Sequence, residues 1–246
     1  IKTFSLDIYR YFINFEDKII TNGVFNEISN DSNYNVTNIN FDDLINNEKD
    51  YDIIKMHEYF KNKEPSLKNK YTGIFKDKNL IFITGESVNI NAIKKDITPT
   101  LYMLTHNGFV FNNFYTPIYY ASTSDGEYTN LTGLLPTEGT WSMIKSSNNN
   151  MKYSLPTMFK TNNYKTYAYH NNTYNFYNRD ITYPNLGFEK YTACGNGLEK
   201  KINCNIWPES DLEMFNETYN DYKNNDKFLA YYMTVSTHLN YKTTNN

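Results

Sequence analysis

The sequence predicts an α/β fold, with a mainly parallel sheet and helices on both faces, preceded by a mostly helical lead-in. From residue 79 onward, short apolar runs typical of buried strands alternate with helical patterns, and this order is typical of parallel sheets. Reactive side chains also follow several of these runs. We therefore expect residues 1–78 to form a helical N-terminal lead-in that packs on a main domain beginning at residue 79.

The composition excludes several classes of protein. Hydrophobic residues make up 39% of the chain, and 24 Tyr and 16 Phe add large apolar areas, so disorder is excluded. The formal net charge of -3 argues against a nucleic-acid partner, which usually requires a basic surface. The sequence shows no apolar run long enough to span a membrane and no signal peptide. Because it starts at Ile1 rather than Met, we expect a piece of a longer product.

The two cysteines, Cys194 and Cys204, lie close together in a Gly/Asn-rich stretch. With no further cysteine and no His pair nearby, a zinc site is disfavoured. Two interpretations stay open: a local disulfide in an extracellular domain, or two free thiols.

The lead-in has two helical patterns. In the first, Phe4, Ile8, Tyr11 and Phe15 recur at helical spacing. An Asn-rich loop is expected over residues 30–40, and the second helical pattern covers residues 41–62.

The main domain alternates strands and helices. Strands are expected at 79–84, 109–115, 164–170 and 228–235. Helices are expected at 97–108, 128–135, 154–160 and 211–224. In the first of these helices, Leu101 and Leu104 are expected to face the core.

Polar side chains follow the predicted strands, where open α/β sheets build their sites. Glu86 comes just after the first strand, while His170 and His238 end or follow later ones. Thr123 follows the strand expected at 109–115. For Glu86, a surface acid or a neighbour of a helix N-cap is the alternative.

The stretch at residues 119–128 is central to the chain. Its small hydroxyl residues, with Thr123 in the middle, are followed by two carboxylates. One interpretation is a nucleophile at a helix start, where backbone N–H groups face an anion. The other is a helix N-cap, which Ser and Thr residues commonly provide.

Several motifs, in this order and spacing, resemble one family between about residues 71 and 241. The chain is similar to the extracellular catalytic domain of lipoteichoic acid synthases, which are phosphoglycerol transferases of the alkaline-phosphatase and sulfatase superfamily. Residues 79–246 would then be the N-terminal portion of a sulfatase-like catalytic domain. The matching pieces are Asn79-Leu-Ile-Phe-Ile-Thr-Gly-Glu-Ser87, Thr123-Ser-Asp-Gly-Glu127, Ser154-Leu-Pro156, His170, Asn178-Arg-Asp180, Gly187-Phe188 and Ser236-Thr-His238.

The resemblance implies a metal-dependent reaction at Thr123. Glu86 and Thr123 would be metal ligands for Mn²⁺ or Mg²⁺, and Thr123 would be the nucleophile. A cation bound to the Thr oxygen lowers its pKa, so that it attacks a phosphodiester. The implied donor is phosphatidylglycerol. Its glycerophosphate group would pass through a threonine-bound intermediate to a growing glycerophosphate polymer.

The resemblance also implies substrate contacts and a location. Residues matching His170, Arg179 and His238 contact glycerophosphate in the family, and Arg179 is suited to bind phosphate bidentately. The alternative for Arg179 is a surface salt bridge with Asp180. The implied location is the extracellular face of the cell membrane of a Gram-positive-type bacterium, with a transmembrane region outside this chain.

Three departures from the family pattern affect these expectations. Asn172 and Tyr177 stand where the family has Asp and Trp, which predicts a retuned pocket for the acceptor or head group. The family's later Asp-His metal pair has no counterpart before Asn246. Two oxygen ligands hold Mg²⁺ or Mn²⁺ poorly, so we expect a truncated portion that is weak or inactive by itself.

Two other functions remain open at this stage. One is another branch of the superfamily, a phosphodiesterase or a phosphoethanolamine transferase. The other is a non-catalytic surface-binding domain that keeps the fold without the metal site.

Overall fold

The computed structural model describes residues 33–35 and 39–238, which fall into two compact units, Ile1–Lys76 and Asp77–Asn246. The described part of the first unit contains helices α2 (Phe41–Asn47) and α3 (Tyr51–Lys61), capped by the side chains of Asn40 and Asp50. The helical pattern expected over 41–62 is therefore confirmed. The helix expected from Phe4 to Phe15 lies outside the described residues, and the packing of the lead-in stays a prediction.

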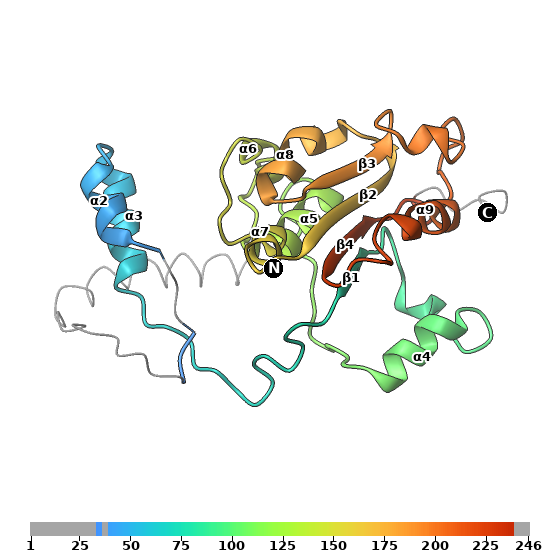
Figure 1. Ribbon diagram of the computed structural model, residues 1–246, viewed down its shortest axis with the longest axis horizontal. Coiled ribbons are helices and arrows are strands. Elements are labelled where there is room, and N and C mark those ends of the chain that lie inside the picture. The colour runs from blue at the N-terminus through green and yellow to red at the C-terminus, as the bar shows by residue number, and fades with distance from the viewer. Residues whose placement is uncertain (1–32, 36–38, 239–246) are drawn as a thin grey trace. The chain divides into compact units, whose positions relative to one another are not determined.

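The second unit is built on a parallel four-stranded sheet (Figure 1). Its strands are β1 (Leu80–Thr84), β2 (Lys165–Thr173), β3 (Lys190–Cys194) and β4 (Phe228–Met233), in the spatial order β1-β4-β2-β3. All three neighbouring pairs are parallel. This confirms the predicted fold class, and it brings the carboxyl ends of all four strands to one edge.

Helices cover both faces of the sheet (Figure 1). On one face lie α5 (Ser122–Thr132), α6 (Ser142–Lys145), α7 (Leu155–Thr161) and α8 (Arg179–Leu186). The other face carries α9 (Asp211–Thr218). Adjacent residues of β4 serve opposite faces, as the alternation of a strand requires: Tyr231 packs with Leu131 of α5, whereas Tyr232 packs with Met214 of α9.

Short 3₁₀ turns complete the second unit. They are Ile90–Ala92, Phe176–Asn178, Leu198–Lys200 and Tyr219–Asp221. Among the described helices of the chain, none is long and apolar enough to cross a membrane.

The strand predicted at 109–115 is wrong. These residues form an irregular, exposed segment, with Phe109 61% and Phe111 77% exposed. The preceding helix, α4 (Pro99–Asn107), is confirmed, but Leu101 and Leu104 are 43% and 56% exposed rather than buried. An apolar alternation becomes a strand only where another strand pairs with it, and no described strand pairs here.

The elements around the site also differ from the prediction in their bounds. The helix expected at 128–135 begins earlier, at Ser122, so the central stretch forms its first turn. It ends at Gly133, which has the left-handed conformation (φ 72°) typical of a helix C-cap. His170 lies inside β2 instead of beyond it, because β2 continues to Thr173 through an irregularity in register.

Three helices and strands were not predicted, and one helix was predicted too long. The unpredicted elements are α6, which has only four residues, β3, which has five, and α8, which carries Pro184 in its interior. The helix expected at 211–224 is α9 followed by a 3₁₀ turn, since regular α-helix ends at Thr218.

Candidate active site

A pocket of about 200 Å³ lies at the carboxyl edge of the sheet, and it brings together all seven predicted site residues. They come from segments that are far apart in sequence: the loop after β1, the start of α5, β2, the turn before α8, and the loop after β4. The lining residues are Glu86, Thr123, His170, Asn172, Phe176, Tyr177, Arg179, Trp207, Met233, Val235 and His238.

Thr123 and Glu86 are in direct contact in this pocket. The Thr123 hydroxyl donates a hydrogen bond to Glu86 Oε2 over 2.8 Å. The Glu86 backbone is held by the loop after β4, since its N–H donates to Thr234 Oγ1 at 2.9 Å and its carbonyl accepts from Thr237. Two residues of the loop after β4 therefore hold the Glu86 backbone, which keeps its carboxylate beside the hydroxyl.

The first turn of α5 is not capped by a Ser or Thr side chain. The N-cap is Ala121, so the capping interpretation of Thr123 is wrong. Instead, Asp125 Oδ2 accepts the backbone N–H groups of Tyr119, Tyr120 and Ala121 at 2.8 to 3.0 Å. This buried carboxylate holds the approach to the helix, which leaves the Thr123 hydroxyl free to contact Glu86.

Glu86 and Thr123 have the ligand atoms that a divalent cation prefers, but two residues are too few to complete its coordination. Their carboxylate and hydroxyl oxygens are ligands that Mg²⁺ and Mn²⁺ accept. However, among the described residues no group of three or more His, Cys, Asp or Glu side chains lies close enough to hold a metal. These two residues would hold one side of an ion that requires about six ligands.

Arg179 is buried in an ion pair with Glu127. The side chains are 1% and 0% exposed, and Arg179 donates from Nε and Nη2 to Glu127 Oε2 at 3.0 and 2.5 Å. Burial opposes the charge of Arg179, but the Glu127 carboxylate outweighs it and raises the pKa of the guanidinium. The alternative of a surface pair with Asp180 is therefore wrong.

His170 is fixed through both ring nitrogens. Its Nδ1 lies 3.0 Å from the Met233 carbonyl, which can only accept, so Nδ1 carries the proton. Its Nε2 lies 3.2 Å from Nη1 of Arg179, which can only donate. Burial, assisted by the Arg179 charge, holds the pKa of His170 well below its usual value, so the ring is neutral.

Tyr177 presents its ring to Arg179, with the guanidinium carbon 5.1 Å from the ring centroid. Both Tyr177 and Asn178 adopt left-handed backbone conformations, with φ of 60° and 56°. Such conformations are costly for residues other than glycine and occur most often at functional sites. The ring of Trp141 packs edge-on against Tyr177 at 5.0 Å and supports its orientation.

Asn172 and His238 complete the pocket from two sides. The Asn172 side chain accepts the N–H of Thr173 at 2.6 Å, which orients it at the end of β2. His238 packs edge-on against Trp207, with the ring centroids 5.1 Å apart. Trp207 was not predicted as a site residue.

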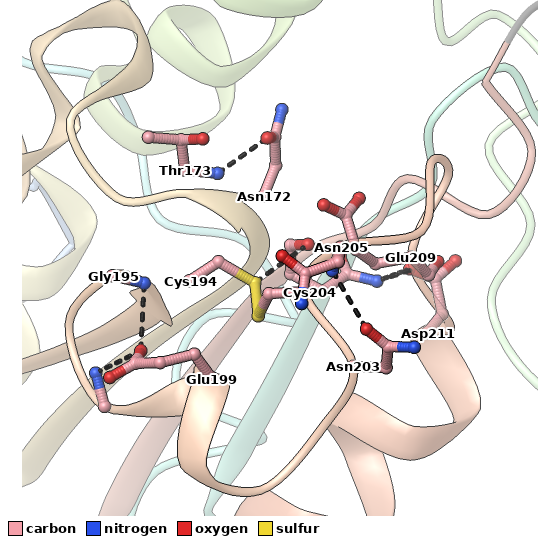
Figure 2. Close-up of a disulfide and its surroundings, with 12 residues drawn as sticks. Asn172, Thr173, Cys194, Gly195, Glu199, Asn203, Cys204, Asn205, Glu209 and Asp211 are labelled. Carbon is pink, nitrogen blue, oxygen red and sulfur yellow. Dashed lines mark hydrogen bonds between the residues drawn. A yellow bond between two sulfur atoms is a disulfide. The ribbon is translucent and has the colours of Figure 1, made fainter.

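A disulfide joins Cys194, at the end of β3, to Cys204, with the Cα atoms 5.8 Å apart (Figure 2). Of the two alternatives left open by the sequence, the structure has the disulfide. It ties the segment that leads to Trp207 to the carboxyl edge of the sheet. Asn172 lies near it in Figure 2.

Glu127 is the polar residue of the site whose role the sequence analysis missed. It stands four positions after Thr123, and residues four apart share one face of a helix. That spacing was a signal that both point toward the sheet edge. Its partner Arg179 is 52 residues away, and no local pattern identifies such a pairing.

Comparison with protein families shows to which family the chain belongs. Residues 78–245 match the model of the family described as Sulfatase. The chain belongs to the sulfatase family. Its parallel sheet with helices on both faces is the fold of this family.

Individual relatives are lipoteichoic acid synthases. Over 147 residues the chain is 29% identical to lipoteichoic acid synthase 2 of Bacillus subtilis (strain 168), covering 57% of this chain and 22% of the relative. Over 199 residues it is 27% identical to the lipoteichoic acid synthase of Staphylococcus aureus (strain USA300), covering 76% and 30%. The matched region is less than a third of either enzyme's length.

A solved structure agrees with these relatives. The chain superimposes on the lipoteichoic acid synthase LtaP from Listeria monocytogenes with a TM-score of 0.58 and 32% sequence identity. The match covers 69% of this chain and 43% of that one. Both the sequence matches and the structural match thus lead to sulfatase-family enzymes of lipoteichoic acid synthesis.

Proposed function

We propose that this chain carries the nucleophile and the glycerophosphate pocket of a phosphoglycerol transferase that takes its donor group from phosphatidylglycerol. The observation that carries the proposal is the pocket itself, where Thr123 contacts Glu86 and where Arg179, His170 and His238 line the same cavity. The similarity to lipoteichoic acid synthases supports the substrate class. The acceptor is the terminal hydroxyl of a glycerophosphate polymer on the extracellular side of a cell membrane.

Thr123 Oγ1 attacks the phosphorus of the phosphodiester. The new bond is between Oγ1 and phosphorus, and the bond from phosphorus to the diacylglycerol oxygen breaks. Diacylglycerol leaves as an alcohol after that oxygen takes up the proton lost by Thr123. Glu86 Oε2 already accepts the Thr123 hydrogen bond and is the acceptor nearest to the proton that the hydroxyl loses. Attack on phosphorus by the acceptor hydroxyl then releases Thr123. A divalent cation at Glu86 and Thr123 would supply the positive charge that lowers the pKa of the hydroxyl.

The remaining pocket residues stabilise and orient the phosphoryl group. Arg179 places a fixed positive charge in a site where few waters screen it, which strengthens its attraction to phosphate oxygens. Thr123 also lies in the first turn of α5, where unpaired N–H groups and the helix dipole favour an anion.

The test is binding of glycerol phosphate to the whole chain, measured by calorimetry and by NMR of the histidine rings. We expect saturable binding with shifts at His170 and His238. Replacing Arg179 by Gln should weaken binding by about tenfold or more, because hydrogen bonds to charged groups contribute strongly. Lys190→Gln, an exposed change on β3 away from the pocket, is the control and should bind as wild type.

Two results would overturn the proposal. One is a folded chain that does not bind glycerol phosphate, with or without Mn²⁺. The other is tighter binding of phosphoethanolamine than of glycerol phosphate, which would move the chain to the phosphoethanolamine-transferase branch. A transfer assay with phosphatidylglycerol and Mn²⁺, comparing wild type with Thr123→Ala, extends the test to chemistry.

A further inference from the structure

Glu127 is a fully buried carboxylate beside the pocket that does not line it. Besides Arg179, its oxygens accept the hydroxyl of Tyr183 and, at 3.3 Å, that of Tyr231. Burial and then the Glu127 charge raise the pKa of both phenols well above the usual value, so they stay protonated and donate. Three side chains from α8 and β4 thus converge on one carboxylate of α5.

The ion pair determines which edge of Arg179 is available. Nε and Nη2 form the planar fork that carboxylates and phosphates bind best, and Glu127 occupies it. Nη1 donates to His170 Nε2 and to the Phe176 carbonyl, each at 3.2 Å. Of the five N–H groups, these bonds leave one on Nη2. Arg179 therefore meets a ligand through the remaining N–H of Nη2, which lies at its Nη1–Nη2 edge.

The same arrangement sets the chemistry of His170. Because Nδ1 donates to Met233, Nε2 is an unprotonated acceptor, and Arg179 holds it so. In this state His170 does not donate a hydrogen bond to a phosphate oxygen from Nε2. It accepts one, either from Arg179 or from a hydroxyl group of the bound ligand.

We propose that Glu127 is a positioning residue, which acts through Arg179 to direct the Nη1–Nη2 edge into the pocket and to keep His170 as a neutral hydrogen-bond acceptor. This rests on the proposed function, because it assigns a role within the same site. It gives the pocket two distinct parts: Arg179 meets the phosphoryl group, and His170 Nε2, once Nη1 of Arg179 turns from it to a phosphoryl oxygen, accepts from a hydroxyl of the transferred glycerol.

The first test reads the ring of His170 directly, in the whole chain labelled with ¹⁵N-histidine. We expect the signature of the Nδ1–H tautomer at pH 7 and no titration of the ring near its ordinary pKa. In Glu127→Gln, Arg179 loses its charged anchor, so the His170 signals should move. Tyr183→Phe removes one hydrogen bond from Glu127 but keeps its charge, and should leave the His170 tautomer unchanged.

The second test is a double-mutant cycle on glycerol phosphate binding. Glu127→Gln alone should weaken binding about tenfold. In an Arg179→Gln background, the same change should alter binding by less than about threefold, since a residue that acts only through Arg179 has nothing left to position. If Glu127→Gln does not fold alone, the effect of Glu127→Gln in the Arg179→Gln background can still be measured. The double variant removes both charges together, so it leaves no unpaired charge in the core.

The outcomes separate this inference from the proposed function. Wild type that binds no glycerol phosphate contradicts the ligand assignment, while the His170 tautomer still decides the positioning role. A His170 that is protonated at Nε2, or that titrates near its ordinary pKa, overturns the inference. So do additive losses in the cycle, which would mean that Glu127 acts independently of Arg179.

Discussion

In the second unit, the apolar helix α4 is exposed and the polar helix α5 is buried, which is the reverse of what their hydropathy predicts. α4 (Pro99–Asn107) carries Leu101, Met103 and Leu104, yet it has no buried residue. α5 (Ser122–Thr132) is polar, with acids and hydroxyls along its length, yet five of its residues are buried. The polar helix lies in the core because Arg179 pairs with Glu127 and the backbone N–H groups of residues 119–121 bind Asp125.

Hydrogen-bonding partners, rather than hydropathy, determine which of these two helices is buried. Burying a carboxylate is costly unless an ion pair or hydrogen bonds compensate for the lost water. Glu127 has the Arg179 ion pair, and Asp125 Oδ2 accepts three backbone N–H groups. On α4, by contrast, the local signals for a helix are sufficient, with Pro99 in the first turn. No described residue covers its apolar side chains enough to bury them.

The largest effect is expected at the buried ion pair. Glu127→Ala leaves Arg179 charged and unpaired in the core, which should cost about 3–5 kcal/mol of unfolding free energy. The matched change in a partly exposed pair, Lys190→Ala beside Asp221, should cost less than about 1 kcal/mol. Urea unfolding of both variants measures the difference, and equal losses would contradict the account.

A leucine pair tests the comparison of the two helices directly. Leu131→Ala in α5 removes a side chain with no exposure and should destabilise the chain by about 2–5 kcal/mol. Leu104→Ala in α4, which is 56% exposed, should change stability by less than about 0.5 kcal/mol. If Leu104→Ala costs as much as Leu131→Ala, α4 is covered in solution.

Gly187, at the C-terminal end of α8, tests how tightly α8 packs against Thr157 of α7. It has φ 104°, and a Cβ there would lie 2.7 Å from the backbone nitrogen of Thr157. Gly187→Ala should therefore lower the unfolding free energy by about 2–3 kcal/mol.

Gly126 in α5 is the matched control for Gly187. An added Cβ there meets only an ordinary contact at 3.5 Å with Thr116. Gly126→Ala should raise stability by about 0.5–1 kcal/mol through the entropy of the unfolded chain. A loss at this position would mean that α5 is packed more tightly than the structure shows.

A pH-dependent effect is expected from Glu209, a buried carboxyl before α9. Burial, with a further contribution from Asp211, raises the pKa of Glu209 to about 7. Its folded-state pKa lies above the unfolded value, so its stabilising contribution is complete below about pH 4.5 and is lost as pH rises through 7.

Glu209→Gln should therefore be more stable than wild type at pH 8, by about 2 kcal/mol, and nearly equal to it at pH 4.5. Thermal unfolding of both proteins at the two pH values measures this. A difference that does not change with pH would contradict the assignment.

Much of the fold could be predicted because its signals are local. The apolar runs that became β1 and β4 are bounded by polar residues or glycine, and Pro and Ser mark the starts of α4 and α7. The error at residues 109–115 has a tertiary cause, since alternation alone does not supply a pairing strand. β3 was missed because a short run with Lys and Thr lacks the apolar signal.

The site residues also differ in how well local sequence signals identify them. Thr123, Glu86, His170, Arg179 and His238 could be singled out because motifs in family order contain them, and the structure places them in one pocket. Their roles remain predictions. The pairing of Arg179 with Glu127 depends on how α5 and α8 lie across the sheet, and no spacing in the sequence carries that information.

The most direct test of the central claim is a crystal structure of the chain with glycerol phosphate and Mn²⁺. The account predicts a phosphate within about 3 Å of Thr123 Oγ1 and of the Nη1–Nη2 edge of Arg179, while Glu127 keeps the other edge. A phosphate bound away from Thr123, or held by Arg179 after it has left Glu127, would contradict it.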